Sequence, residues 1–234
     1  MAQRTVNDIA DLLDGTLSWR RMELLALGAA IEDAERHANG SPLARALARS
    51  GVALLYAHWE GFVKEACQGY VDFVARRRLR LEELNDGFLR TVLLSLSKRA
   101  IAGDDVGIDA LVDAVRRPTE SRARMSKNSI VDTKSNLRFA VLAEIMESVG
   151  FEIEPFTTKD KLIDKSLCDN RNSIAHGRSI YPDVGSFNAL RDEVLEMMET
   201  LRDLILSAVR QQSYRAIPST QTVPAPRTDE TVQT

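Results

Sequence analysis

The chain has 234 residues, of which 44% are hydrophobic and 28% are charged. This apolar content excludes an intrinsically disordered chain, and 12 glycines with 7 prolines are too few for a fibrous or linker-rich protein. The net charge of −3 argues against a globally basic nucleic-acid coat protein, although it allows a local basic groove.

Apolar residues recur at steps of three and four, which predicts helices along almost the whole chain. The first predicted helix spans residues 5–38 and ends before Gly40, because glycine is common just after a helix C-terminus. Ser41 and Pro42 are typical of an N-cap and a first helical position, and they begin a second helix that extends toward Arg78. The wide apolar stripe of this second helix predicts a central position among several neighbours.

The rest of the chain predicts shorter elements and a polar tail. Residues 118–136 are expected to form a loop, and no strand is predicted. Residues 212–234 are rich in proline and threonine and are expected to be disordered. Further helices are expected over residues 86–100, 104–116, 135–149, 158–176 and 186–211. The predicted organisation is therefore one all-α domain over residues 1–211, with a core over about residues 41–211.

The polar side of the predicted helix over residues 158–176 carries the groups best suited to chemistry. On a continuous helix, Asp169, Asn172 and His176 share one stripe. Arg171 lies five residues before His176, so the two side chains are about 140° apart around the helix axis. They converge only if the helix frays at His176 or if a second chain supplies the other half of a site.

An arginine and a histidine in this arrangement suit phosphate chemistry. The arginine fork matches phosphate oxygens, and histidine exchanges protons near neutral pH. Cleavage of RNA by its own 2′-OH needs both abilities, and one Arg171–His176 pair from each of two chains would suffice without a metal. The alternative is that both are ordinary surface residues near a helix end, where a cation suits the helix dipole.

Two strings in the sequence resemble the HEPN superfamily. RNSIAHG, over residues 171–177, resembles the signature of that superfamily. LLYAHWEGFVKEA, over residues 54–66, resembles the central helix of a branch found in prokaryotic defence and toxin–antitoxin loci. The resemblance covers about residues 41–211. It implies an all-α bundle of HEPN type, with an inserted helical and loop region, that forms a homodimer through the motif-bearing helices.

The resemblance also implies a function and assigns roles to the motif residues. It implies a metal-independent endoribonuclease that takes RNA as its substrate, needs no cofactor and has a possible antitoxin or other defence protein as a partner. Carried over, His176 would be the general acid and base, Arg171 the phosphate binder and Asn172 a supporting polar residue. Two alternatives stay open: a non-catalytic module that binds RNA, a nucleotide or a partner protein, and a purely structural scaffold.

Three more polar residues are candidates for supporting this site. Asp169 shares the polar stripe of the motif helix, and His58 and Glu60 flank the apolar stripe of the second helix. His58 and Glu60 could hydrogen-bond the motif helix, with Glu60 pairing Arg171. A buried structural pair or simple exposure is an equal alternative for both residues. Trp59, inside the stripe, is expected in the core.

Two basic stretches could follow an RNA backbone. One ends the second predicted helix, and the other lies between residues 116 and 138, where seven basic residues accompany two acidic ones. A solvated loop is the slightly favoured interpretation of the second stretch. The candidates for RNA-backbone contacts are Arg76, Arg77, Arg78, Arg122, Arg124 and Lys127.

Several other classes of protein and site find no support in the sequence. The three histidines and two cysteines show no zinc-site spacing, and there is no glycine-rich phosphate loop or nucleophile elbow. The N-terminus lacks the pattern of a signal peptide, and no apolar run approaches the roughly 18 residues that span a bilayer. We therefore expect a cytoplasmic protein without a metal site or a membrane span.

Overall fold

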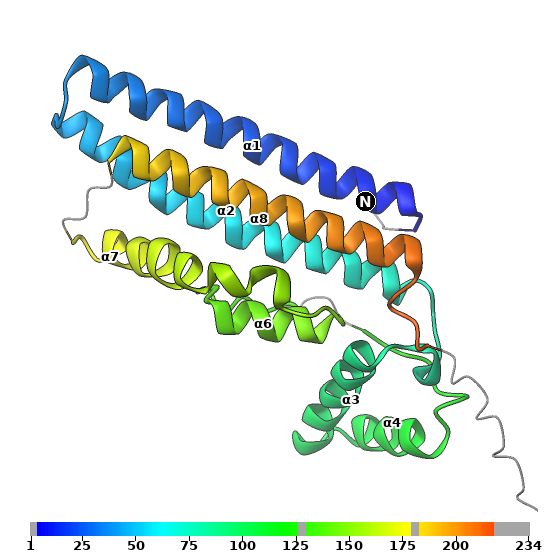
Figure 1. Cartoon of the computed structure of the whole chain (residues 1–234). Coiled ribbons are helices and arrows are strands. Elements are labelled where there is room, and N and C mark those ends of the chain that lie inside the picture. The colour runs from blue at the N-terminus through cyan, green and yellow to red at the C-terminus, as the bar shows by residue number, and fades with distance from the viewer. Residues whose placement is uncertain (1–3, 126–129, 179–182, 218–234) are drawn as a thin grey trace, which may run out of the picture.

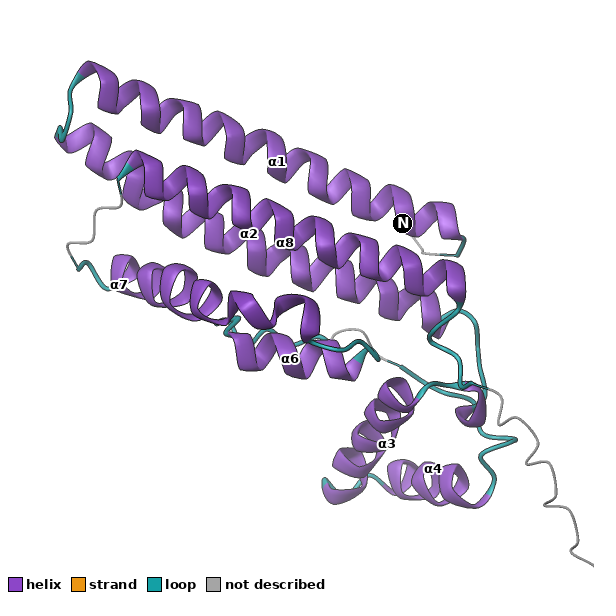
Figure 2. Ribbon diagram, viewed as in Figure 1, coloured by secondary structure: helices purple, strands orange, loops and turns teal. Residues whose placement is uncertain are grey.

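The computed structural model of the chain describes residues 4–125, 130–178 and 183–217. These residues form helices joined by loops, and no strand occurs among them (Figure 2). Two isolated backbone bridges are their sole extended pairings. The predicted all-α fold class is confirmed. Within the same ranges, no helix has the length and apolar character needed to cross a membrane.

Three long helices lie side by side and form the main layer of the bundle (Figure 1). They are α1 (Val6–His37), α2 (Pro42–Ala75) and α8 (Val184–Gln211). A capping box begins α1, because the Thr5 hydroxyl accepts the Asp8 N–H while the Asp8 carboxylate accepts the Thr5 N–H. The Ser41 hydroxyl caps α2, with Pro42 in its first turn, as the sequence predicts.

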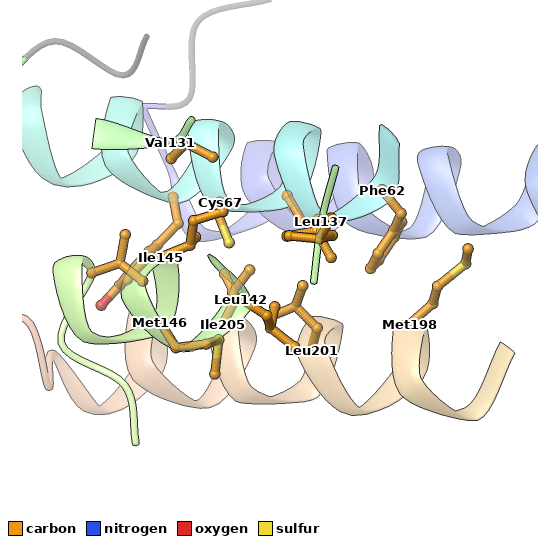
Figure 3. Close-up of a cluster of buried hydrophobic side chains, with 14 of the residues drawn as sticks. Phe62, Cys67, Val131, Leu137, Leu142, Ile145, Met146, Met198, Leu201 and Ile205 are labelled. Carbon is orange, nitrogen blue, oxygen red and sulfur yellow. The ribbon is translucent and has the colours of Figure 1, made fainter. Parts of the chain in front are cut away.

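A second layer of shorter helices packs against the long helices, chiefly against α2 (Figure 1). It comprises α6 (Phe139–Ser148), the 3₁₀ turn η2 (Glu154–Lys159), the π-helix η3 (Leu162–Asp169) and α7 (Asn170–Ala175). Part of the core lies between the two layers, where Cys67 of α2, Leu142 of α6 and Leu201 of α8 are fully buried (Figure 3). Another part lies among the three long helices, where α1 contributes the fully buried Ile9, Leu13 and Leu24. Trp59 is also fully buried, as expected.

A helical hairpin lies at one end of the bundle, next to the short 3₁₀ turn η1 (Leu81–Glu83) (Figure 1). It consists of α3 (Asp86–Ile101) and α4 (Asp105–Arg116), which pack against each other. The start of α3 also packs against the end of α6. A Cβ atom added at Gly87 would lie 2.5 Å from the Gly150 Cα atom, so this contact requires glycine.

Two predicted helices have different boundaries in the structure. The helix expected over residues 135–149 begins only at Phe139, because Lys134 and Ser135 both have φ of +52°. The Asp164 carboxylate accepts the Phe139 N–H at 2.7 Å and so satisfies a free donor at the start of α6. The single α-helix expected over residues 158–176 is instead a series of 3₁₀, π and α segments.

The ordered domain extends past the boundary expected at residue 211. Tyr214 is buried and packs against Phe73, with ring centroids 6.0 Å apart. Its carbonyl accepts the Asn85 N–H at 3.0 Å, which ties residues 212–217 to the start of α3. The expectation of disorder is therefore wrong for residues 212–217, and residues 218–234 lie outside the described part of the chain.

The contact between α3 and α6 can be tested with an alanine substitution. We expect Gly87→Ala to lower the free energy of unfolding by about 1–3 kcal/mol, because the new methyl group would meet backbone atoms that cannot move aside easily. Gly15→Ala is the matched control, since a Cβ there meets nothing within 4 Å and should stabilise α1 by about 0.5–1 kcal/mol. Urea denaturation measures the free energy of unfolding of both variants. Equal changes in the two variants would contradict the requirement for glycine at residue 87.

Candidate functional site

The motif residues lie on a chain segment that changes its helical winding. The π-helix η3 passes directly into α7 at Asn170. A π turn holds more residues than an α turn, so Asp169 is displaced from the stripe that a continuous α-helix predicts for it with Asn172 and His176. Asn172 is half-buried, while His176 is exposed.

His176 is the C-cap residue of α7, which ends at Ala175, and a tight helix end presents it. The Gly177 N–H donates to the Ile174 carbonyl at 3.0 Å, and the Arg178 N–H donates to the Ser173 carbonyl at 2.9 Å. These two bonds define a Schellman motif, and Gly177 takes the left-handed conformation, with φ of +74°, that the motif requires. The imidazole therefore stands at the helix end in contact with solvent.

Arg171 is half-buried and held in one orientation. Its guanidinium carbon lies 4.2 Å from the centroid of the Tyr56 ring, and its Nη2 donates to the Ser135 carbonyl at 2.7 Å. The Tyr56 hydroxyl accepts the Leu137 N–H at 2.7 Å. Burial raises the pKa of Tyr56 to about 12, so the phenol stays neutral. We call these contacts of Arg171 with Tyr56 and Ser135 the arginine clamp.

An open hollow of about 410 Å³ borders the arginine clamp. Small and apolar side chains such as Ala53, Ala57 and Ile174 form much of its wall. The Arg171 Nε atom is buried and has no hydrogen-bond partner among the described residues. Glu60 borders the same hollow, yet no ion pair within 4.0 Å joins it to Arg171, contrary to the predicted pairing.

Asp169 stabilises the motif segment through two ion pairs. Its carboxylate lies 2.6 Å from Arg138 Nη2 and 3.1 Å from Lys165 Nζ. Hydrogen bonds from Arg138, and then from Lys165, hold the pKa of Asp169 below its ordinary value. Because Arg138 is the N-cap residue of α6, the first pair joins the end of η3 to the start of α6. Asp169 thus helps to hold the motif helix α7 in place against α6.

His58 faces α1 and not the motif helix. It is 4% exposed, its Nε2 lies 3.1 Å from a Glu23 carboxylate oxygen, and its ring meets Trp19 edge-on at 5.2 Å. Of the two interpretations left open for His58, this position fits the buried structural pair, with Glu23 as the partner, and not a hydrogen bond to the motif helix. The reason is angular, since successive residues of a helix point about 100° apart and His58 lies two positions from Tyr56.

Two further residues of the central-helix string also serve the packing of α1 on α2. Arg20 of α1 is 3% exposed and pairs with Glu65 at 3.1 Å. A Cβ atom added at Gly61 would lie 3.1 Å from the Arg20 guanidinium, so glycine leaves room for it. The string HWEGFVKE is therefore largely explained by packing between helices.

The basic candidates lie at the far end of α2 from the arginine clamp. Arg76 pairs with Asp72 at 2.8 Å, so its charge is already compensated. From Tyr56 to Ala75 the helix axis rises about 28 Å, at about 1.5 Å per residue. Lys127 lies outside the described residues. The structure thus separates the predicted phosphate-binding motif from the predicted backbone contacts.

The pH dependence of stability should report the packing role of His58. Burial lowers the pKa of His58 and Arg20 lowers it further, while Glu23 opposes them. The unfolded chain then takes up the proton more readily, so stability is complete above about pH 6.5 and is lost as the pH falls toward the pKa of the folded state. Between pH 7.5 and pH 5.5, we expect urea denaturation to show a smaller loss of unfolding free energy for His58→Gln than for wild type. The same loss in both would contradict this, and the exposed His37→Gln variant is the control.

The comparisons with known proteins bear on what this arrangement does. No group of three or more histidine, cysteine or carboxylate side chains in the described ranges could hold a metal ion. No curated protein and no solved structure matches the chain. The sequence model of the RiboL-PSP-HEPN family matches residues 16–207, which include the central-helix string and the motif of α7. The chain therefore belongs to the RiboL-PSP-HEPN family of the HEPN superfamily.

Proposed function

We propose that this protein is a metal-independent endoribonuclease of the HEPN type. The observation that carries the proposal is the arrangement on α7, where the arginine clamp fixes Arg171 and the Schellman motif presents His176 to solvent. One short helix thus supplies a fixed phosphate-binding cation and an accessible proton carrier. Membership of the HEPN superfamily supports the same function.

The two side chains divide the work of RNA cleavage. The remaining N–H groups of Arg171 bind the scissile phosphate and stabilise the charge that develops on its oxygens. A His176 imidazole accepts the proton of the 2′-OH as that oxygen attacks phosphorus, and a protonated imidazole donates a proton to the leaving 5′-oxygen. The products are a 2′,3′-cyclic phosphate and a 5′-OH. Asn172 lies between Arg171 and His176 in the sequence, and its side chain is half-buried. We assign it the role of supporting the positions of these two residues.

We further propose that the complete site belongs to a homodimer. Within the described part of one chain, no hydrogen bond joins Arg171 to His176, and residues five apart on a helix point about 140° apart. A second copy of α7 would bring one chain's histidine toward the other chain's arginine. The small residues Ala53, Ala57 and Ala175 around the hollow allow such close approach of helices. Sedimentation of the active protein tests this, because cleavage by a stable monomer would contradict a shared site.

Substitution of His176 tests the proposed activity. We expect His176→Ala to reduce cleavage of a single-stranded RNA by about 10²–10⁴-fold in the presence of EDTA, since the variant lacks the proton carrier. His37→Ala is the matched control, because His37 is also an exposed histidine at a helix end. Cleavage by His176→Ala at the wild-type rate would exclude the assigned role.

The arginine clamp makes a separate prediction for Tyr56. Tyr56→Phe keeps the ring beneath Arg171, whereas Tyr56→Leu removes it, so we expect the cleavage rate to fall about fivefold more in the leucine variant if the ring–cation contact is worth about 1 kcal/mol. The readout is kcat against KM with the same RNA, after denaturation curves have matched the folded fractions. If both variants cleave equally, the ring has no positioning role.

A second candidate function is a non-catalytic module that binds RNA, a nucleotide or a protein through the same hollow beside Arg171. The observation that favours it is the engagement of Arg171 Nη2 by the Ser135 carbonyl, which occupies one donor before any substrate binds. The two candidates differ in products, because a binding module retains RNA without cleaving it at any protein concentration.

The biological setting follows from the resemblance of the central helix. We propose that the protein acts as a toxin or an antiphage effector and that a neighbouring gene supplies an antitoxin or another defence protein. The string over residues 54–66 supports this setting. Inspection of the adjacent open reading frames, followed by co-expression with the neighbouring product, tests it. Growth arrest that the neighbour does not relieve would count against an antitoxin.

A further inference from the structure

Two basic stretches that are about forty residues apart in sequence lie side by side at the end of α2. The Leu81 N–H donates to the Ser121 carbonyl at 2.9 Å, and the Ala123 N–H donates to the Leu79 carbonyl at 3.0 Å. Side chains alternate along this pairing as in a β ladder. Leu79, Leu81 and Ala123 point inward and are buried, which leaves the arginines between them on the outside.

Four of these exposed arginines have no acidic partner within the described part of the chain. Arg76 pairs with Asp72 at 2.8 Å, and Arg80 lies 3.9 Å from Glu82. No carboxylate of the described residues lies within 4.0 Å of the other four guanidinium groups. We call these four residues the arginine ridge: Arg77, Arg78, Arg122 and Arg124.

Contacts with the protein order part of the arginine ridge. The Arg77 guanidinium carbon lies over the Phe73 ring, 4.0 Å from its centroid, and the Arg77 Nη2 donates to the Arg4 carbonyl at 3.1 Å. Arg122 Nη1 donates to the Arg78 carbonyl at 3.5 Å, which ties the two basic stretches together. Ordered cations lose less side-chain entropy when they bind a ligand. The ridge is thus prepared for a ligand with many negative charges.

We propose that the arginine ridge binds the phosphate backbone of RNA outside the cleavage site, an inference that rests on the proposed ribonuclease function. A protein partner would need apolar anchors beside the charges. The apolar residues of this pairing, Leu79, Leu81 and Ala123, are buried, so they cannot serve as such anchors. Such a surface contacts phosphates without reading the sequence of bases.

The position of the ridge determines which RNAs it can hold. It lies about 28 Å along α2 from the arginine clamp, and a strand advances about 3.4 Å per stacked nucleotide. An RNA seated at Arg171 must therefore extend about eight or nine nucleotides to reach the ridge of the same chain. A tetranucleotide can occupy the cleavage site alone.

Binding of two RNAs to ridge variants tests the proposal. All proteins carry His176→Ala, so that RNA stays intact whether or not the wild type is a nuclease. For a single-stranded 20-mer, we expect Arg122→Gln/Arg124→Gln to reduce the slope of log affinity against log salt by about 1.4, because each phosphate contact contributes about 0.7. Arg77→Gln/Arg78→Gln should have the same effect, and tetranucleotide affinity should stay unchanged. The control is Arg36→Gln/Arg45→Gln, which removes equal charge at the α1–α2 turn.

Three other outcomes of the binding experiment would overturn the proposal. An unchanged salt slope would mean that the ridge does not touch phosphate, and an equal loss in the control would report net charge alone. Displacement of the 20-mer by polyglutamate at equal charge concentration would assign the ridge to an acidic protein. If the wild type cleaves no RNA, the proposed activity fails, but ridge binding is still read from the same salt slopes.

Discussion

The arrangement of the molecule depends on the burial of α2 between neighbouring helices. Half of the residues of α2 are buried, and the helix contacts α1, α8, η3 and α7. Each face of α2 packs against a different neighbouring element. That neighbour determines which side chains fit at the positions of α2 that face it. Gly61 makes room for Arg20 of α1, whereas Tyr56 lies beneath Arg171 of α7. The central-helix string therefore records two requirements at once, the packing of α1 and the orientation of the motif arginine.

The periodicity of apolar residues predicts the long helices well because each has one face against the core. The cap residues Thr5 and Ser41 place the starts of α1 and α2 within a residue or two, since local hydrogen bonds decide where a helix begins. The π-helix η3 is not predictable in this way, because a pattern analysed at 3.6 residues per turn assumes the winding that η3 departs from. The late start of α6 at Phe139 depends on Asp164, which is distant in sequence.

The sequence predicts which residues form the candidate site but not which residues surround them. Arg171 and His176 belong to one short motif, so their shared helix follows from sequence alone. The partners of Arg171 do not, because Tyr56 and Ser135 reach it through the tertiary fold. One sequence feature could have indicated Tyr56 as a partner of Arg171. Tyr56 is an aromatic residue one helical turn before Glu60, in the same string, and Glu60 was already a candidate partner of Arg171. A histidine such as His58 is a more obvious candidate for catalysis than Tyr56 is. However, its partner Glu23 lies on α1, which packs on a different side of α2 from the motif helix α7.

Ion pairing determines which cations of this nearly neutral chain can act on a phosphate. Many of its arginines face a carboxylate, as Arg20 faces Glu65 and Arg138 faces Asp169, and these pairs serve the fold. Arg171 differs because its partners include the Tyr56 side chain and the Ser135 carbonyl, neither of which cancels its charge, and because its buried Nε has no acceptor among the described residues. An anion that reaches this guanidinium would satisfy donors that the fold leaves unpaired, in surroundings where part of the competing water is excluded. A net charge of −3 is therefore compatible with an RNA-directed site.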